Sequence, residues 1–530
     1  MNINKRTKVV GILIWAAALA VLSVPAVAQL IDKTKAPNNS NDGIHKSLSE
    51  QIGTGRGDYM IPYSSMFVIN RDPFRAIRRG RQLFQRKFTR AEGNGPNIGD
   101  GIGDINSSLA IGAGLTDSCA SCHGRPRGAA GVGGDVVTRP DSRDAPHLFG
   151  LGLKEMLADE ITTDLRAVRT QAANEARSSH ASITRRLVSK GIDFGTITAN
   201  ADGSIDASHV EGVNADLRVR PFFHHGGTIS IREFVVGALQ NEMGLQAVDP
   251  DLAKAAAGEK TTTTSGMVLD GSLDNVEGPP TADPSADPDG DGIANEIPSS
   301  LVDYFEFYLL NYFKAATYEQ TDETRRGRNL LEKIGCTNCH VPELQVNRDR
   351  RVADVETVYD PVNGIFNNLF ATAAPLFSSI DDHSGFPMLK QPALKSFLVN
   401  NIFTDFKRHD LGPSFYERNY DGTTSKLFMT TALWGVGSTS PYGHDGRSIN
   451  LVEVILRHGG EAQTARDAFA RLPAEKRVAV LEFLNSLVLF PPDDTASTLD
   501  RGNRNAAAFP QVAHGSIKLT ALFNDPGDVE

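Results

Sequence analysis

Two copies of one pentapeptide constrain this chain more than any other feature: Cys119-Ala120-Ser121-Cys122-His123 and Cys336-Thr337-Asn338-Cys339-His340. In a C-x-x-C-H pentapeptide the two thiols form thioether bonds with a haem, and the adjacent histidine is its proximal iron ligand. The two motifs use all 4 cysteines of the chain, so none remains for a disulfide or a zinc site. If the motif occurred only once, a redox dithiol or half of a zinc knuckle would be an alternative explanation. Two complete copies predict two covalently bound haem c groups.

The N-terminus has the pattern of a secretory signal. Basic side chains among residues 5–8 precede an apolar run over residues 9–24, and Ala26-Val27-Ala28 supplies the small residues of a cleavage site. We predict a signal peptide over residues 1–28 and a periplasmic or secreted mature protein. An uncleaved membrane anchor is the alternative, because the run is nearly long enough to span a bilayer. No later segment is apolar enough to do so.

The net charge of the mature chain limits which classes of molecule are expected to bind it. Without the signal, 3 of the 54 Lys and Arg residues are lost and 51 remain against 64 acidic residues, a formal charge of about −13. An acidic surface argues against nucleic acid as a partner. It favours a basic redox protein, and we expect a small electron donor of the cytochrome or cupredoxin type.

Four sequence blocks recur in the same order in the two halves of the chain. They are an Arg-Arg-Gly-Arg block at 78–81 and 325–328, the C-x-x-C-H motif, a Leu-aromatic-Gly-x-Gly block at 148–152 and 433–437, and a His-containing block at 224–233 and 444–453. Such a repeat predicts two homologous haem domains, each with its haem bound after the first helix. We place them at residues 59–316 and 317–490, with extended arms at 29–58 and 491–530.

The fold class that follows is mainly α, with two cytochrome c-like haem domains related by internal duplication. Apolar residues at helical spacing predict helices at 80–88, 153–190, 231–237, 302–313, 325–334 and 474–489. Few stretches alternate like strands. The region 192–210, with its Asp202-Gly203 turn, is a candidate small β-hairpin insertion.

With these blocks the chain resembles the dihaem oxidoreductases of the peroxidase-like branch, which are related to the bacterial dihaem cytochrome c peroxidases. The methylamine-dehydrogenase-maturing enzyme and the haem rubber oxygenases are more distant members. The resemblance runs from about residue 78 to residue 489 and is carried by both C-x-x-C-H motifs and by the segments Pro146–Gly152, Asn241–Gly244, Phe403–Asp405, His409–Gly412 and Pro441–Gly446. It implies that one haem reacts with the oxidant while the other relays electrons.

The resemblance also implies unequal ligands for the two haems. His458 stands where the peroxidases take the second axial ligand of the relay haem, so haem 2, at the second motif, is expected to have His340 and His458 as ligands. The alternative is that His458 is a surface histidine at a helix end without a ligand role. Ala238 stands at the equivalent position in the first half, so haem 1 is expected to have an open site. His147 is the nearest alternative ligand but aligns with Ala432, which favours a packing or loop role.

Glu242 is the candidate catalyst that the resemblance suggests at haem 1. It lies at about the offset where the peroxidases have a distal glutamate, and a carboxylate there can move a proton between the two oxygens of hydrogen peroxide. An exposed glutamate at a helix end is the alternative. One departure is that His224 occupies the position of the Trp that the peroxidases have between their haems. The one Trp of the mature chain, Trp434, belongs to the second half.

An acidic loop between the repeats is a candidate Ca²⁺ site. The stretch from Asp287 to Glu296 offers oxygen ligands at alternate positions and a glycine at the sharp turn. The candidate ligands are Asp287, Asp289, Asp291, Asn295 and Glu296. The pattern is incomplete, because Pro298 occupies the twelfth position, and a solvated acidic turn is the alternative.

The function predicted from these features is a periplasmic dihaem oxidoreductase that reduces hydrogen peroxide at haem 1 with electrons relayed through haem 2. Two other classes stay open. One is an O₂-dependent haem oxygenase or a protein-modifying oxidase, since an open ferrous haem binds O₂. The other is a dihaem electron carrier without a substrate.

Overall fold

The computed structural model describes residues 47–101, 114, 116–124, 144–311, 317, 320–359, 369–419, 422–489 and 517–518. The predicted signal peptide and most of the two predicted arms lie outside these residues. Within the described ranges no helix combines the length and the apolar character needed to cross a bilayer.

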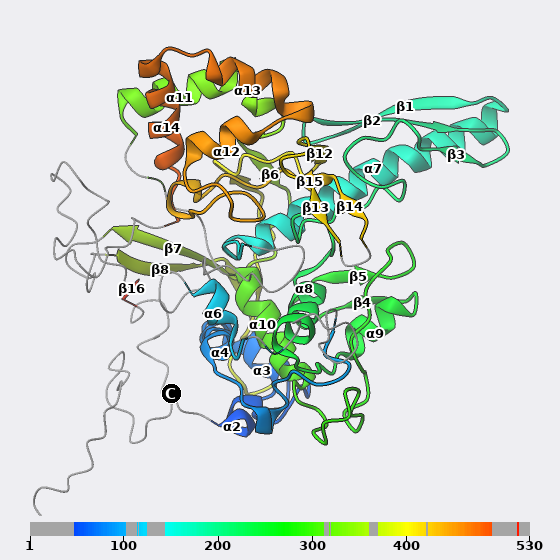
Figure 1. Cartoon of the computed structure of the whole chain (residues 1–530). Coiled ribbons are helices and arrows are strands. Elements are labelled where there is room, and N and C mark those ends of the chain that lie inside the picture. Colours follow the sequence, from blue (N-terminus) through cyan, green and yellow to red (C-terminus); the bar gives the residue numbers. More distant parts are fainter. Residues whose placement is uncertain are drawn as a thin grey trace, which may run out of the picture.

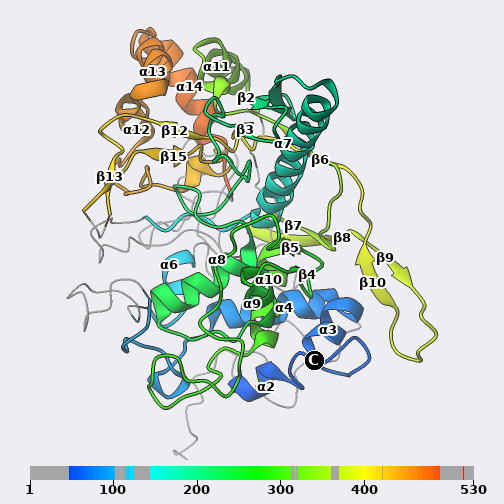
Figure 2. The same ribbon diagram turned by 90° about the vertical axis from the view of Figure 1, so that its right-hand side faces the viewer.

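The described residues form two lobes, and one long helix extends from between them and runs beside the second lobe (Figure 1 and Figure 2). The first lobe contains α2 (Leu48–Ile52), α3 (Ser65–Arg71), α4 (Pro73–Gln85), η1 (Arg90–Glu92), α6 (Cys119–His123), α8 (Ile231–Ala238), η2 (Leu239–Met243), α9 (Pro250–Ala256), α10 (Ser299–Asn311) and the hairpin of β4 (Lys260–Thr262) and β5 (Val268–Asp270). The second lobe contains α11 (Asp322–Lys333), η3 (Cys336–Asn338), η4 (Val436–Ser438), α12 (Leu451–Arg457), η5 (Gly460–Ala462), α13 (Gln463–Ala470) and α14 (Ala474–Asn485). The long helix is α7 (Leu151–Ser179).

Both lobes use the same helix crossing next to their haem-binding motif. α4 crosses α10 at Gly80, and α11 crosses α14 at Gly327. A Cβ atom at either glycine would collide with a backbone carbonyl oxygen of the facing helix, that of Tyr304 or of Ala479. Only glycine allows backbones to approach so closely. The repeated Arg-Arg-Gly-Arg block therefore marks a point of tight helix packing in each lobe.

The predicted helix over residues 153–190 is wrong at its C-terminal end. α7 ends at Ser179, His180 takes a left-handed φ of 52°, and the chain returns as β1 (Ile183–Ser189). β1 pairs antiparallel with β2 (Ile192–Ala199), which pairs with β3 (Ile205–Asp206) across the predicted turn. The β-branched Ile, Thr and Val of residues 183–188 favour an extended strand over a further helical turn. The predicted hairpin is thus one part of a three-stranded sheet.

Residues 344–429 contain much more β structure than we predicted. They form short antiparallel pairs: β6 (Leu344–Val346) with β11 (Phe397–Val399), β7 (Ala353–Tyr359) with β8 (Leu369–Pro375), β9 (Phe377–Ile380) with β10 (Leu389–Pro392), β12 (Arg408–Asp410) with β15 (Leu427–Met429), and β13 (Glu417–Arg418) with β14 (Thr424–Ser425). β8 also pairs in parallel with β16 (Ile517–Lys518). Most of these strands have two to four residues, too few for a recognisable alternation of apolar and polar side chains.

The β9–β10 hairpin extends from the second half of the chain to the first lobe (Figure 2). Arg71 of α3 forms an ion pair of 2.7 Å with Asp382, and its side chain is fully buried. The ring of Phe67 packs edge-on against Phe386 with centroids 5.5 Å apart. This hairpin therefore fastens residues of the second half onto the first lobe.

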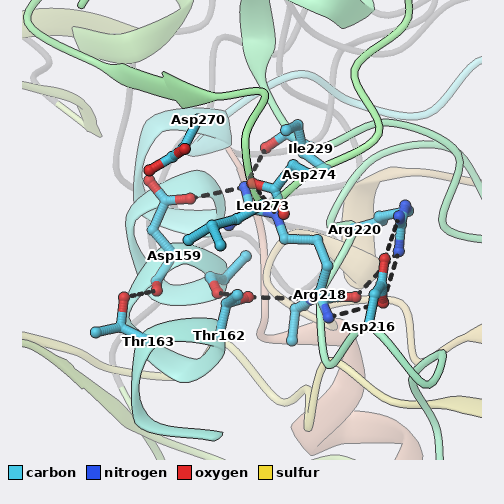
Figure 3. A network of polar contacts seen from close by, with 12 residues as sticks. Asp159, Thr162, Thr163, Asp216, Arg218, Arg220, Ile229, Asp270, Leu273 and Asp274 are labelled. Carbon is cyan, nitrogen blue, oxygen red and sulfur yellow. Dashed lines mark hydrogen bonds and ion pairs between the residues drawn. The ribbon is translucent and has the colours of Figure 1, made fainter. Parts of the chain in front are cut away.

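A polar network attaches α7 to the segment that leads into α8 (Figure 3). Arg218 donates to Asp159 of α7 at 2.8 Å and lies 3.7 Å from Asp274. The amide of Val219 donates to the hydroxyl of Thr162 at 3.0 Å. Since Arg218 is 6% exposed, these charge-assisted bonds hold the start of the His-containing block against a rigid helix.

The glycine crossing generates a stability prediction. Gly327→Ala should lower the free energy of unfolding by about 1–3 kcal/mol, because its methyl group overlaps the facing helix. Gly237→Ala is the matched control: it lies in α8, and a Cβ there would have only the Asn241 side chain nearby, at 3.9 Å. Denaturant unfolding followed by circular dichroism measures both. Equal effects of the two substitutions would contradict the tight crossing.

Candidate haem and cation sites

The first motif forms the short helix α6, which packs against α4. His123 donates its Nδ1 hydrogen to the carbonyl oxygen of Pro146 over 2.7 Å. This bond fixes the ring tautomer and leaves the Nε2 lone pair available to a metal. Burial raises the pKa of Cys119 to about 12 and also raises that of Cys122. A redox dithiol needs a lowered thiol pKa, so these cysteines fit haem attachment better than thiol–disulfide chemistry.

The second motif repeats this arrangement in the other lobe. Its cysteines flank η3, and His340 donates its Nδ1 hydrogen to the carbonyl oxygen of Phe403 over 3.0 Å. Burial raises the pKa of Cys336 to about 11. Burial, and to a smaller extent the His458 ring, lower the pKa of His340 to about 4. A neutral imidazole with its Nδ1 engaged is the form in which histidine binds iron.

His458 lies at the C-terminal end of α12, close enough to His340 to affect its pKa. Its Nδ1 donates to the carbonyl oxygen of Val454 over 2.7 Å, so Nε2 is again the nitrogen left for a ligand. Phe415 packs edge-on against the ring with centroids 5.2 Å apart. The structure therefore brings together the two histidines that the sequence pairs as ligands of haem 2.

In the first lobe the helix equivalent to α12 is α8, and it ends at an alanine where α12 is followed by His458. Ala238 is followed by the π-helical turn η2, which carries Glu242. The Glu242 side chain is half-buried, and its charge contributes, after burial, to the raised pKa of Cys122. Its carbonyl oxygen accepts a hydrogen bond from the amide of Gly114 at 3.1 Å. A π-turn inside a helix is frequently a functional feature, and this one brings a carboxylate to the first motif.

The boundary between the lobes contains aromatic rings rather than a Trp at position 224. The rings of His224 and His444 have centroids 5.8 Å apart, and Phe428 stacks on His444 at 4.3 Å. His444 Nε2 lies 3.2 Å from Glu417 Oε2, with both side chains buried. These two histidines hold equivalent positions in the repeated His-containing block.

Trp434 and His147 lie together on the other side of this boundary. The Trp434 ring, 3% exposed, lies directly over Gly150 of the first half, where a Cβ atom would overlap it. His147 is 8% exposed and faces the Trp434 backbone, and burial lowers its pKa to about 3. Both residues contribute to packing between the two halves, as expected for His147.

The polar network around His409 was not predicted from the sequence. His409 Nε2 donates to Asp405 at 2.9 Å and Nδ1 donates to Glu461 at 2.7 Å. Burial opposes the charge of this ring, but the bonds to Asp405, Cys339 and Glu461 outweigh it and raise the pKa of His409 to about 11. An imidazolium is thus held beside a cysteine of the second motif. The segment 409–412 entered the sequence analysis only as part of a resemblance, because Glu461 is too distant in sequence to signal the pairing.

The acidic loop folds so that three of the five predicted cation ligands come together. Oxygen atoms of Asp287, Asp289 and Asp291 lie within 4.8 Å of one another. Glu296 is 2% exposed, and the charges of Asp289 and Asp291 act on it after burial itself. Asn295 is exposed with a left-handed φ of 57°, which is the geometry of a turn residue.

Asp100 is a further member of this cluster that we did not predict. It is 1% exposed and contributes, after burial and the side chain of Asp287, to the raised pKa of Asp289, although it lies in a glycine-rich segment far from the acidic loop in sequence. An acidic residue between two glycines, Gly99 and Gly101, was the signal available.

Comparison with known protein families gives a match to a segment in the second half of the chain. Residues 343–487 match the family described as "Di-haem oxidoreductase, putative peroxidase". This match confirms, for that segment, the resemblance found in the sequence. No curated protein matches the chain.

The solved structures similar to this chain include two with low identity and low TM-scores. One is the hydrazine synthase of Kuenenia stuttgartiensis, at 15% identity and a TM-score of 0.21, with 36% of this chain and 55% of that chain covered. This chain therefore spans about half the length of that relative. The other is a MauG-like protein associated with microbial copper homeostasis, at 12% identity and a TM-score of 0.25, with 64% of this chain and 88% of that chain covered.

The His409 network generates a pH prediction. The folded protein keeps a proton on His409 that the unfolded chain releases near its ordinary pKa of about 6.5. Stability should therefore fall as pH rises from that value toward the folded pKa of about 11, by at most about 1.4 kcal/mol per pH unit. Glu461 is 53% exposed, so solvent reduces the effect.

The measurement is the free energy of unfolding at pH 6.5 and at pH 9.5. His409→Gln should show a smaller loss between the two values than the parent protein. His383→Gln is the matched control, because that imidazole is 87% exposed and lies outside the cluster. A loss in His409→Gln equal to that in the parent would contradict the assignment.

Proposed function

We propose that this protein is a periplasmic dihaem c-type oxidoreductase that reduces hydrogen peroxide at haem 1 with electrons relayed through haem 2. The observation that carries the proposal is the unequal environment of the two motifs. α12 ends at His458 beside His340, whereas α8 ends at Ala238 and continues into the turn that carries Glu242. One motif has a second candidate iron ligand and the other has a carboxylate.

The residues that would hold the cofactors follow from the motif geometry. Haem 1 is attached at Cys119 and Cys122 with His123 as iron ligand, and haem 2 at Cys336 and Cys339 with His340 and His458 as ligands. The three histidines share one feature: each engages Nδ1 with a backbone carbonyl and keeps Nε2 for iron. This donor set fits haem c at both motifs.

Glu242 is proposed as the acid–base group. When bound, the haems supply the redox chemistry, in which hydrogen peroxide takes up two electrons and two protons to give two water molecules. The Glu242 carboxylate would receive the proton of one peroxide oxygen and deliver it to the other, so that the leaving oxygen departs as water rather than hydroxide. Its place in a turn of unusual geometry supports a fixed orientation for this transfer.

Packed rings support an electron route between the lobes. From His458 the ring centroids follow at 5.2 Å to Phe415, 6.3 Å to His444 and 5.8 Å to His224. These rings lie on the boundary between the two motifs. A Trp at position 224 is therefore not required for electrons to pass through densely packed protein.

The domain organisation predicted from the sequence is consistent with the proposed dihaem function. The haem domains are residues 59–316 and 317–490, related by duplication, and the shared glycine crossing supports their relationship. Export through the predicted signal and the excess of acidic residues favour a small basic donor protein of the cytochrome or cupredoxin type. The acidic loop is proposed to hold Ca²⁺, for which carboxylate oxygens are the preferred ligands.

The assignment of His458 leads to a spectroscopic prediction. His458→Ala should convert haem 2 of the ferric protein from low spin to high spin, because the axial ligand is lost. Optical and electron paramagnetic resonance spectra detect this change. His383→Ala, an exposed site, is the control and should leave the spectra unchanged. An unaltered low-spin signal in His458→Ala would remove His458 as the ligand.

The assignment of Glu242 leads to a kinetic prediction. Glu242→Gln keeps the shape of the side chain and removes the base, so the rate of reaction with hydrogen peroxide should fall by at least about a hundredfold. Stopped-flow absorbance measures this rate. Glu259→Gln is the control, because that side chain is exposed and distant in sequence from the motifs. A rate within about threefold of the parent would exclude Glu242, since general acid–base groups contribute more than that.

A further inference from the structure

The acidic cluster joins two segments that are far apart in sequence. Asp287, Asp289 and Asp291 belong to the loop that precedes α10, and Asp100 belongs to the loop that precedes the first motif. Asp100 lies close enough to Asp289 to contribute, after burial and the side chain of Asp287, to the raised pKa of Asp289. Carboxylates at such short range repel one another unless a proton or a cation offsets their charge, so the cluster is incomplete as a set of free carboxylates.

A second observation points to a ligand in this cluster. Glu296 is 2% exposed, and among the residues that the structure describes its Oε1 atom has no hydrogen-bond donor; within the same residues, the buried Oδ2 atom of Asp289 has none either. Buried carboxylate oxygens without a donor are rare in folded proteins. Burial together with the neighbouring carboxylates raises the pKa of Asp289 to about 7 and that of Glu296 to about 9. A bound cation would satisfy both oxygens.

The other contacts of the cluster orient its oxygens. Asp287 accepts hydrogen bonds from the amides of Gly290 and Gly292, both at 2.9 Å, and so folds the loop. Asp291 accepts from the side chain of Asn97 at 3.3 Å. Carboxylates from several loop positions with irregular spacing favour Ca²⁺ over Mg²⁺, which demands a near-ideal octahedron and keeps its water.

The cluster is tied directly to the turn that carries Glu242. The amide of Gln246 donates to Glu296 at 2.8 Å, and its side chain donates to Asp100 at 3.0 Å. On the other side of the turn, the side chain of Asn94 and the amide of Gly95 donate to the carbonyl oxygen of Met243 at 2.7 and 3.1 Å. The Glu242 turn is therefore held by the same loop that supplies Asp100.

Close packing makes this attachment specific. A Cβ atom at Gly244 would meet the Asp100 carboxylate, and one at Gly101 would overlap the Asn241 side chain. Loop 94–101 and the turn thus touch through glycines on both sides of Glu242. If Asp100 moves away from the cluster, the contact between loop 94–101 and the turn that carries Glu242 is therefore disturbed.

We propose that Ca²⁺ bound by Asp100, Asp289, Asp291 and Glu296 fastens loop 94–101 to the Glu242 turn, so that occupancy of the cation site controls the order of the haem 1 pocket. Asp287 folds the loop around the site. Without the cation, like charges at short range push the two loops apart and the turn loses its support. An effect of Ca²⁺ on catalysis would follow only if Glu242 has its proposed role. The attachment of the turn to loop 94–101 does not depend on that role.

The experiment uses the purified holoprotein, either with EGTA or with added CaCl₂. Hydrogen–deuterium exchange by mass spectrometry reports on peptides covering residues 94–101 and 239–246, and titration calorimetry reports Ca²⁺ affinity. At a free concentration of about 100 times Kd, Ca²⁺ should slow exchange in both peptides by up to about a hundredfold. Peptides of α11 and α14 in the other lobe should not respond.

Asp100→Asn is the diagnostic variant, and Asp283→Asn is its control. The first removes one charge while keeping an oxygen for Gln246, and it should weaken Ca²⁺ binding at least about tenfold, as loss of a charged ligand does. Asp283 is exposed, and among the described residues its side chain accepts only from residue 285, so its variant should bind like the parent. Because the parent is measured with and without Ca²⁺, poor folding of a variant leaves the test intact.

Three results would overturn the proposal: no Ca²⁺ binding by the parent, unchanged affinity in Asp100→Asn, or Ca²⁺ binding without a change of exchange in residues 239–246. The last would leave the cation as a purely local support of the acidic loop. Failure of the proposed catalysis is distinguishable. If Glu242→Gln reacts with hydrogen peroxide like the parent while Ca²⁺ still protects the turn, the cation link stands and the role of Glu242 falls.

Discussion

A single hydrogen bond at each motif, from a histidine Nδ1 to a backbone carbonyl, determines how this fold can hold iron. His123 uses Pro146 and His340 uses Phe403. The Pro146 segment packs against the second half, as the Trp434 ring over Gly150 illustrates, whereas Phe403 packs against Phe483 of α14 in its own lobe. The helix crossings at Gly80 and Gly327 bring the motif-bearing segments against the cores of their lobes. Ligand orientation is therefore a product of the whole packing arrangement, not of the pentapeptide alone.

The two lobes share this plan and differ where their reactivity would differ. In the second lobe the helix after the His-containing block ends at His458, next to His340. In the first lobe the equivalent helix runs into a π-turn that is supported by loop 94–101 and by the acidic cluster. Under the proposed function, this difference at one helix end would separate an electron relay from a reactive site within one chain.

Much of this arrangement could be predicted from local sequence, and the rest could not for identifiable reasons. The two motifs and the helix over residues 231–237 follow from local sequence, and the repeat together with the family resemblance points to His458. Residues 183–189 were misassigned, because apolar spacing continues through a left-handed turn at His180 that ends the helix. The short strand pairs of residues 344–429 carry too few residues for a pattern. Asp100 and the partner of His409, Glu461, join their clusters only through tertiary folding, and no sequence period marks such contacts.

The central claim is that the two haems have unequal coordination, and resonance Raman spectroscopy of the ferric protein tests it most directly. The spin-state marker bands distinguish six-coordinate low-spin iron from five-coordinate or water-bound high-spin iron. The account predicts equal amounts of one low-spin haem, with His340 and His458 as ligands, and one high-spin haem bound at His123. A spectrum with two low-spin haems, or with two high-spin haems, would contradict it.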